Sequence, residues 1–391
     1  MIIQSLLDTD IYKYSMMQAV LHQFPGAEVE YRFQCRTPDV DLRPLMQDIE
    51  REIEQLCSLR LDPEELNFLK GLRYIKADFV EFLRLFQLQS RFVDVGENDG
   101  QLAITIRGPW LHTILFEVPV LAIISELYSR HAWPDHDLSE GRRRLEEKIG
   151  QVQALDQPEG LIFADFGTRR RFSRQWQDEV VTTLAREIPD SLRGTSNVRL
   201  AHELDLVPIG TMAHEFIQAC QALGPRLAET QRFAFEVWAR EYRGDLGIAL
   251  SDTYSLKAFL RDFDMYFCKL FDGARQDSGD PELWAEAMIE HYEKNRVDPR
   301  TKNLVFSDSL TIPKAASIWL RFRERVNVSF GIGTNLTNDT GADPINIVIK
   351  MTGCNGQPVV KLSDSPGKVV STNQDYLAWV RNAFDVPESD S

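Results

Sequence analysis

The second half of the chain contains short apolar runs that each end abruptly in a small or charged residue and precede a helical stretch. These runs are Leu161–Ala164 before Asp165, Leu206–Ile209 before Gly210, Ile248–Leu250 before Ser251 and Asp252, Leu304–Phe306 before Ser307 and Asp308, and Val326–Phe330 before Gly331. Continuous apolar strands separated by helices are typical of a parallel sheet covered on both faces. The pattern predicts an α/β barrel with its site at the carboxyl ends of the strands. An open doubly wound sheet is the alternative.

The first part of the chain has a different pattern. Apolar and polar residues alternate in Glu28–Arg36 and in Gln101–Arg107, which predicts half-buried strands, and Pro44–Phe92 between them is typical of helices. We therefore predict a smaller α+β domain at residues 1–125 and an α/β barrel at residues 126–344.

Two further strands are predicted near the C-terminus, at Ile345–Lys350 and Val359–Leu362. They either close the barrel or return to the first domain, so part of residues 345–391 is expected to join that domain.

Charge and composition exclude some classes of protein. The formal net charge of -15 argues against a nucleic-acid partner, which needs a basic surface. The N-terminus lacks the pattern of a signal peptide, and the apolar run Ile114–Ile124 is interrupted by Glu117 and Pro119, so no membrane span is expected. The five cysteines are widely spaced, which favours reduced thiols in a cytoplasm.

An arginine-rich segment follows the first apolar run. Apolar residues at four-residue spacing from Phe172 to Leu184 predict a helix that begins here. Arginines in the first turns of a helix oppose its macrodipole, and that cost is offset if an anion binds there. The alternative is a solvated basic face paired with neighbouring acids. The segment reads Asp165-Phe166-Gly167-Thr168-Arg169-Arg170-Arg171-Phe172-Ser173-Arg174.

His214 lies in the segment Gly210–Glu215, just beyond another predicted strand. A histidine at such a place acts as a base, a ligand or a nucleophile. The spacing is not HExxH, because position 218 is Gln218, so a zinc protease site is excluded. The alternative is a histidine that caps or packs the start of a helix.

Four aspartates fall at or just beyond predicted strand ends, namely Asp252, Asp277, Asp280 and Asp308. Converging carboxylates hold Mg²⁺ on a pyrophosphate or stabilise a developing cation. Each of them, taken alone, is equally well explained as the cap of the following helix. Four at equivalent places favour a site.

Two loops near the C-terminus are less specific. Gly331-Ile332-Gly333-Thr334-Asn335 follows a strand and suits a phosphate cradle of backbone amides, although a turn that needs positive φ explains it nearly as well. The loop Lys361–Lys368 contains two lysines and is unspecific on its own.

Taken together and in order, these segments resemble the nicotinate phosphoribosyltransferase family. The resemblance runs from Leu6–Lys13 to the Lys361–Lys368 loop, and its most specific parts are Asp165–Ser173, Gly210–Glu215, Arg275–Asp280 and Ser329–Thr334. It implies a type II phosphoribosyltransferase fold, which is an irregular α/β barrel with a smaller α+β domain, and a homodimer with shared active sites. It also implies that nicotinate, phosphoribosyl pyrophosphate and ATP are substrates, that Mg²⁺ is required, and that the product enters NAD salvage.

The resemblance also implies roles for single residues. His214 resembles a histidine that ATP phosphorylates. Phe166 resembles an aromatic residue that stacks on the pyridine ring, with Tyr12 of the partner subunit on the other face, and Arg169 resembles an arginine that contacts the ring substituent or a phosphate. The ribose and pyrophosphate are expected near Asp252, Arg275, Asp277 and Asp308, and the 5′-phosphate near Gly331, Gly333 and Thr334. The metal ligands and the roles of Lys361 and Lys368 stay open.

Three rival functions are weighed by what each requires. A nicotinamide-using relative has an aspartate where this chain has Ser196, and an aspartate would repel an anionic substrate, so Ser196 favours nicotinate. We expect this pocket to present Arg169 and Ser196 and no carboxylate. An aldolase or isomerase on the same barrel needs a Schiff-base lysine or a carboxylate base at a strand end, and no lysine is so placed. A non-catalytic binding module would not need so many charged residues at strand ends.

Overall fold

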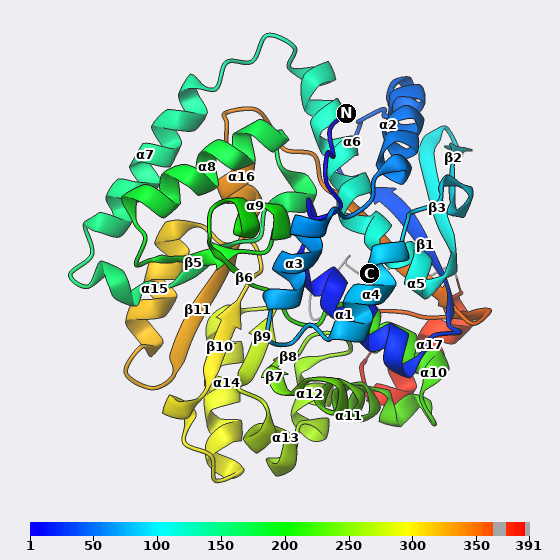
Figure 1. Cartoon of the computed structure of the whole chain (residues 1–391). Helices are drawn as coiled ribbons and strands as arrows, with labels where there is room; N and C mark the ends of the chain where they lie inside the picture. The colour runs from blue at the N-terminus through cyan, green and yellow to red at the C-terminus, as the bar shows by residue number, and fades with distance from the viewer. Residues whose placement is uncertain (363–372, 388–391) are drawn as a thin grey trace.

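The computed structural model describes residues 1–362 and 373–387, so Lys368 lies outside the described residues (Figure 1). Seven parallel strands form a curled, incomplete barrel in the order β6-β5-β4-β11-β10-β9-β8, and the predicted α/β barrel is confirmed. The strands are β4 (Phe163–Asp165), β5 (Leu192–Thr195), β6 (Val207–Pro208), β8 (Ile248–Leu250), β9 (Gly273–Gln276), β10 (Asn303–Phe306) and β11 (Asn327–Ile332), and a short β7 (Arg243–Leu246) precedes β8.

Helices lie outside this sheet and supply the second layer of the barrel, as α7, α8, α14 and α15 show in Figure 1. Polar residues in the segments that follow the strands cap several of them; for example, the side chain of Ser173 accepts a hydrogen bond from the backbone of Trp176 at the start of α8. The barrel-region helices are α7 (Ser139–Gln153), α8 (Arg174–Glu187), α9 (Val198–Glu203), α10 (His214–Leu223), α11 (Thr230–Tyr242), α12 (Leu256–Asp262), α13 (Met265–Leu270), α14 (Pro281–Lys294), α15 (Ile312–Phe322) and α16 (Thr334–Thr337).

A separate antiparallel sheet has the order β13-β12-β1-β3-β2. Tyr31 of the central strand β1 pairs with Met351 of β12 on one side and with Ile106 of β3 on the other. The later strand therefore returns to the N-terminal sheet. The bounds are β1 (Glu28–Cys35), β2 (Val93–Asn98), β3 (Gln101–Pro109), β12 (Ile347–Cys354) and β13 (Gln357–Pro358).

The predicted strand at Val359–Leu362 is wrong. This segment is buried, but its backbone forms no continuous pairing with a neighbouring strand. The Val360 N–H donates to the Gln221 side chain, and the Leu362 N–H donates to the carbonyl of Thr253. Its apolar side chains fill the core without the period of a strand.

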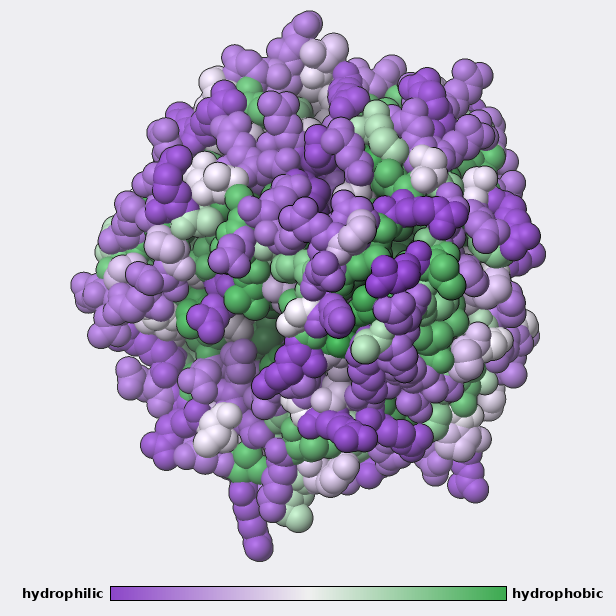
Figure 2. Space-filling view, viewed as in Figure 1, coloured by the Kyte–Doolittle hydropathy of each residue, from purple (hydrophilic) through white to green (hydrophobic). Residues whose placement is uncertain are grey.

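The helical run Trp110–Ala132, which comprises α5 (Trp110–Thr113), a 3-10 turn and α6 (Glu117–Ala132), has the length and composition of a membrane span. This helical run is longer than the apolar run Ile114–Ile124 that was identified in the sequence. However, 89% of its most apolar window is buried inside the protein, so it packs as a core helix. Around this run lie α1 (Ile11–Gln23), α2 (Met46–Ser58) and α4 (Ala77–Leu85), and α3 (Pro63–Gly71) packs on α4. The late helix α17 (Gln374–Phe384) lies against the barrel region, where Phe384 stacks on Tyr254. The face in Figure 2 is mostly hydrophilic, with small hydrophobic groups between the charged side chains.

Candidate active site

A cavity of about 760 Å³ lies where the carboxyl ends of the parallel strands face the antiparallel sheet. The sheet register explains why distant residues meet there. Leu250 pairs with Arg275, and Gln276 pairs with Phe306, so Asp277 and Asp308 leave neighbouring strands at the same edge. The predicted site residues on the cavity wall are Tyr12, Phe166, Arg169, Ser196, His214, Arg275, Asp277, Asp308, Gly333 and Thr334, together with Lys361.

Two predicted site residues lie behind the wall instead of on it. Asp252 is 1% exposed and contacts His214 from the rear, and Gly331 is buried in β11. A Cβ atom at Gly331 would come within 2.2 Å of the Phe166 ring, so this glycine makes room for the aromatic side chain. For Gly331, close packing is therefore a better explanation than a phosphate cradle.

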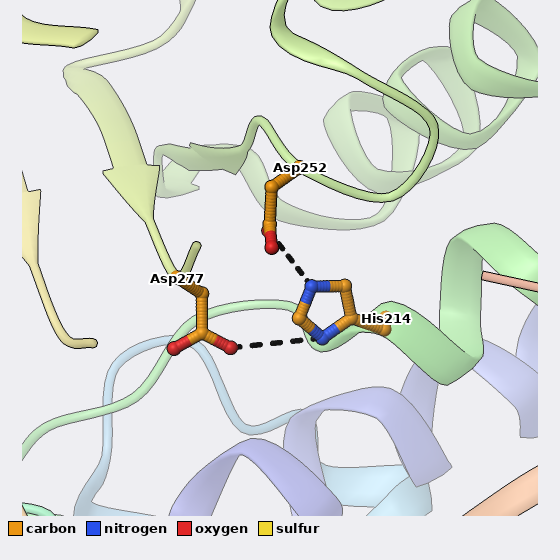
Figure 3. Close-up of side chains that lie close together, drawn as sticks. All are labelled: His214, Asp252 and Asp277. Atoms are coloured by element: carbon orange, nitrogen blue, oxygen red, sulfur yellow. Dashed lines mark hydrogen bonds and ion pairs between the residues drawn. The ribbon is translucent and has the colours of Figure 1, made fainter. Parts of the chain in front are cut away.

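The His214 ring lies between the side chains of Asp252 and Asp277, and its shorter contact is to Asp252 (Figure 3). The His214 Nε2 atom lies 2.8 Å from Asp252 Oδ1, while Asp252 Oδ2 accepts from Lys361 Nζ at 2.7 Å and from Ser278 Oγ at 2.6 Å. The His214 Nδ1 atom lies 3.8 Å from Asp277 Oδ2. The histidine begins α10 and makes no capping bond there, so the capping alternative is not what the structure shows.

The charge states of this group follow from the same contacts. Burial raises the pKa of Asp252, but Lys361 and His214 outweigh it and hold that pKa well below its ordinary value. Burial and the Lys361 ammonium together lower the pKa of His214, against the opposing pull of Asp252. A neutral imidazole therefore faces an ionised carboxylate, which only accepts hydrogen bonds. The ring proton must sit on Nε2, and the lone pair on Nδ1 points toward Asp277 and the cavity.

The His214, Asp252 and Asp277 side chains have the spacing of a metal site, since their ligand atoms lie within 4.8 Å of one another. They do not fit Mg²⁺. The ion prefers an octahedron of oxygen ligands, and Asp252 already binds the Lys361 ammonium. Asp277 and Asp308 on the cavity wall offer the oxygen donors that fit Mg²⁺ better. The fourth aspartate, Asp280, accepts from the backbone of Glu282 and Leu283 and caps α14, so for Asp280 the capping alternative is correct.

The arginine-rich segment divides into cavity residues and structural residues. Arg169 and Arg170 lie in a 3-10 turn on the cavity wall, whereas Arg171 is fully buried and donates two hydrogen bonds to Asp8, at 2.7 and 2.8 Å. Only Arg174 belongs to the first turn of α8. The expectation of four arginines at a helix N-terminus is therefore wrong, and two of the four line the cavity.

Ser196 does not leave the pocket free of carboxylates, as we had expected. Its hydroxyl donates to Asp10 Oδ1 at 2.7 Å, and Asp10 lies on the cavity wall. Burial raises the pKa of Asp10, while Arg169 and the Ser196 hydroxyl oppose that shift. Glu117 and Glu215 also line the cavity. The prediction from Ser196 alone missed these three carboxylates, because they come from other segments of the chain.

Tyr12 lies on the cavity wall of its own chain. The preceding residues are fixed to the barrel, because Asp8 is buried against Arg171 and the backbone N–H of Ile11 donates to the carbonyl of Ser196 at 2.8 Å. A Cβ at Gly210 would meet Ile11 and Tyr12, so this approach is close. One chain thus brings a tyrosine to the site, and a contribution from Tyr12 of the partner subunit stays a prediction.

The fold and the site together define a barrel enzyme whose cavity combines cationic, carboxylate and aromatic side chains at the carboxyl ends of parallel strands. Comparison with known proteins narrows this class. Residues 7–125 match the model of the nicotinate phosphoribosyltransferase N-terminal domain, and residues 161–388 match that of the nicotinate phosphoribosyltransferase family.

Relatives match over nearly the whole chain. A nicotinate phosphoribosyltransferase of Cupriavidus necator is 59% identical, and one of Bordetella pertussis is 58% identical, with 99% of this chain covered in both cases and 99% and 96% of the relatives. The crystal structure of a Vibrio cholerae nicotinate phosphoribosyltransferase superposes with a TM-score of 0.95 at 39% identity, covering 99% of this chain and 95% of the other. One from Porphyromonas gingivalis gives 0.92 at 37% identity, covering 98% and 100%. The chain belongs to the nicotinate phosphoribosyltransferase family, and it is an enzyme of the phosphoribosyltransferase class.

Proposed function

We propose that the chain joins nicotinate to the phosphoribosyl group of phosphoribosyl pyrophosphate and couples this reaction to ATP hydrolysis through a phosphohistidine at His214. The products are nicotinate mononucleotide and pyrophosphate, with ADP and phosphate from ATP, and the reaction is a first step of NAD salvage. The observation that carries the proposal is the geometry at His214, whose Nδ1 faces the cavity while Asp252, itself bound by Lys361, contacts Nε2 from behind.

The cavity contains groups for each part of the phosphoribosyl transfer. Displacement of pyrophosphate from a ribose carbon develops positive charge on the sugar and negative charge on the leaving group. Arg275 suits the leaving group, and the carboxylates of Asp277 and Asp308 suit the sugar or the Mg²⁺ that would neutralise the pyrophosphate. Gly333 and Thr334 line the same cavity and are our proposal for the 5′-phosphate.

Nicotinate is proposed to lie against Phe166 with its carboxylate toward Arg169. Burial lowers the pKa of Arg169, but Tyr12, Glu117 and Asp10 outweigh it and keep the guanidinium charged. An arginine fork is the side chain best suited to a carboxylate. Nicotinamide is the second candidate substrate, and the Asp10 carboxylate beside Ser196 favours it, because a carboxylate accepts a hydrogen bond from an amide.

Purified protein should be assayed with phosphoribosyl pyrophosphate, Mg²⁺ and either pyridine, with and without ATP. We expect far better use of nicotinate than of nicotinamide, and stimulation by ATP. The His214→Ala variant should lose the acid-labile, base-stable phosphate that the parent protein gains from ATP, while a slower, ATP-independent synthesis persists. Equal use of both pyridines, or an undiminished phosphate label in His214→Ala, would contradict the proposal.

We also propose a homodimer in a cytoplasm, with neither nucleic acid nor a membrane as a partner. The net charge of -15 and the wide spacing of the cysteines support the location and the lack of a nucleic-acid partner. The dimer rests on the resemblance alone.

A further inference from the structure

Three charged side chains meet at the edge of the cavity, where Glu117 and Glu215 line the wall and Lys13 lies behind them. Lys13 of α1 is fully buried, and its Nζ contacts the Oε2 atom of Glu117 and lies 2.6 Å from the Oε2 atom of Glu215. Glu117 begins α6, and Glu215 follows His214 in α10. Three helices are thus joined by one ammonium between two carboxylates, which we call the lysine cluster.

Glu117 is shared between this lysine and the proposed substrate arginine. Its second oxygen, Oε1, lies 3.5 Å from Arg169 Nη1, beyond the usual length of a charged hydrogen bond. The Glu117 side chain is 13% exposed and the Arg169 side chain 41% exposed, and both line the cavity. The carboxylate is therefore held tightly by Lys13 and only loosely by Arg169.

We propose that Lys13 is a specificity-determining positioning residue, because it holds Glu117 back from Arg169 and so leaves the guanidinium free for the carboxylate of an anionic pyridine. This inference rests on the proposed function, in which that pyridine is nicotinate. Without the ammonium, Glu117 would form a close, two-pronged pair with Arg169. The substrate would then compete with a carboxylate that belongs to the protein.

The two carboxylates of the lysine cluster differ in what they would do if Lys13 were removed. Burial raises the pKa of Glu215 to about 7, so this group takes up a proton easily and stays where it is. Burial also raises the pKa of Glu117, but Lys13 and Arg169 outweigh it and lower that pKa. Glu117 would keep Arg169 as a cationic neighbour and would remain an anion that competes for it.

The test compares Lys13→Met, Glu117→Gln and the double variant. Their KM and kcat for nicotinate are measured, together with the inhibition constant of uncharged nicotinamide. In Lys13→Met we expect the nicotinate KM to rise about tenfold or more, which is the effect of one competing ion pair of modest strength. The nicotinamide constant should change less than about threefold, because a neutral ring does not compete for the same charge. The double variant should return the nicotinate KM to within about threefold of the parent value, because the competing charge is gone.

Lys302→Met is the matched control for the loss of a buried lysine. Lys302 is 7% exposed and donates to the carbonyl of Phe271 at 2.7 Å, and it does not line the cavity. This variant should lose stability and keep the parent KM. If Lys13→Met does not fold, Glu117→Gln alone decides, because the proposal requires an unchanged or lower nicotinate KM.

Three results would overturn the inference: an unchanged nicotinate KM in folded Lys13→Met, a KM that stays high in the double variant, or a raised KM in Glu117→Gln. The last result would mean that Glu117 orients Arg169 for the substrate. These comparisons require a parent enzyme that uses nicotinate. A parent enzyme that does not use nicotinate would refute the proposed function itself.

Discussion

Replacing Asp252 by asparagine should reverse the tautomer of His214 with little change of shape. In the parent protein, Lys361 Nζ and Ser278 Oγ both donate to Asp252 Oδ2, at 2.7 and 2.6 Å. Asparagine has one acceptor oxygen, which must face these two donors. Its NH₂ group then faces His214 Nε2, and that nitrogen must accept. The ring proton moves to Nδ1, the atom that faces the cavity.

The size of the effect follows from the loss of the lone pair at Nδ1. An aspartate-to-asparagine change that imposes the wrong histidine tautomer lowers turnover about 10⁴-fold in a serine protease triad. We expect the rate of phosphohistidine formation to fall by about 10³- to 10⁴-fold here, which corresponds to about 4–5.5 kcal/mol of activation free energy. The ATP-independent synthesis of nicotinate mononucleotide should fall much less, because it does not use this nitrogen.

The assay follows the transfer of labelled γ-phosphate from ATP to the protein, with a quench in base. Ser278→Ala is the matched control, since it removes one donor to the same carboxylate and leaves an ionised acceptor for His214. Its labelling rate should fall less than about tenfold, as expected for one lost hydrogen bond to a charged group. A labelling rate in Asp252→Asn equal to that of Ser278→Ala would refute the tautomer argument.

Three further outcomes are expected. In Lys361→Met the pKa of His214 should rise, because the Lys361 ammonium helps to lower it. The acid limb of the pH profile of phosphohistidine labelling should therefore move to higher pH. A limb at the parent position would contradict this role of Lys361. In Asp8→Ala the buried Arg171 loses its carboxylate, which should cost about 3–5 kcal/mol of unfolding free energy in urea at pH 7. Because the pKa of Asp8 is lowered from 3.8 to about 2, its contribution is complete above pH 3.8 and is lost as the pH falls through 2, and a penalty unchanged at pH 2 would contradict the pairing. If Tyr12 of the partner subunit completes the site, mixed dimers of Tyr12→Ala and Asp308→Ala chains should regain partial activity, because one site of each mixed dimer carries neither change. Verified mixed dimers without any recovery would show that each chain uses its own tyrosine.

The sequence predicted those barrel strands whose residues are continuously apolar. It missed β5 and β9, whose sequences Leu-Arg-Gly-Thr and Gly-Ala-Arg-Gln have too few apolar residues to mark a strand. A Cβ at Gly273 would lie 1.8 Å from the carbonyl oxygen of Asn303, so this glycine permits the close approach of the neighbouring strand. A strand that packs closely because glycine has no side chain therefore shows no run of apolar residues in the sequence.

The candidate site was predictable where its residues sit at strand ends. His214 and Asp308 were found in this way, since the carboxyl ends of parallel strands meet at one edge. Asp10 and Glu117 were not found, because their place depends on how the N-terminal segment and α6 pack on the barrel. One signal was available: Glu117 is the only charged residue in the apolar run Ile114–Ile124, and a lone charge in such a run needs a buried partner.

Two residues of the lysine cluster follow directly after residues of the cavity wall in the chain. Tyr12 and Lys13 are neighbours in the first turn of α1, and His214 and Glu215 are neighbours in the first turn of α10. Successive residues of a helix point about 100° apart, so the first of each pair faces the cavity while the second takes part in the Lys13–Glu215 ion pair, and Glu215 also borders the cavity. The Lys13–Glu215 ion pair therefore fixes the distance between the two helix starts. A substitution that loosened this ion pair would move both wall residues at once, so the neutral-pyridine measurement and the double variant separate a charge effect at Arg169 from a displaced wall.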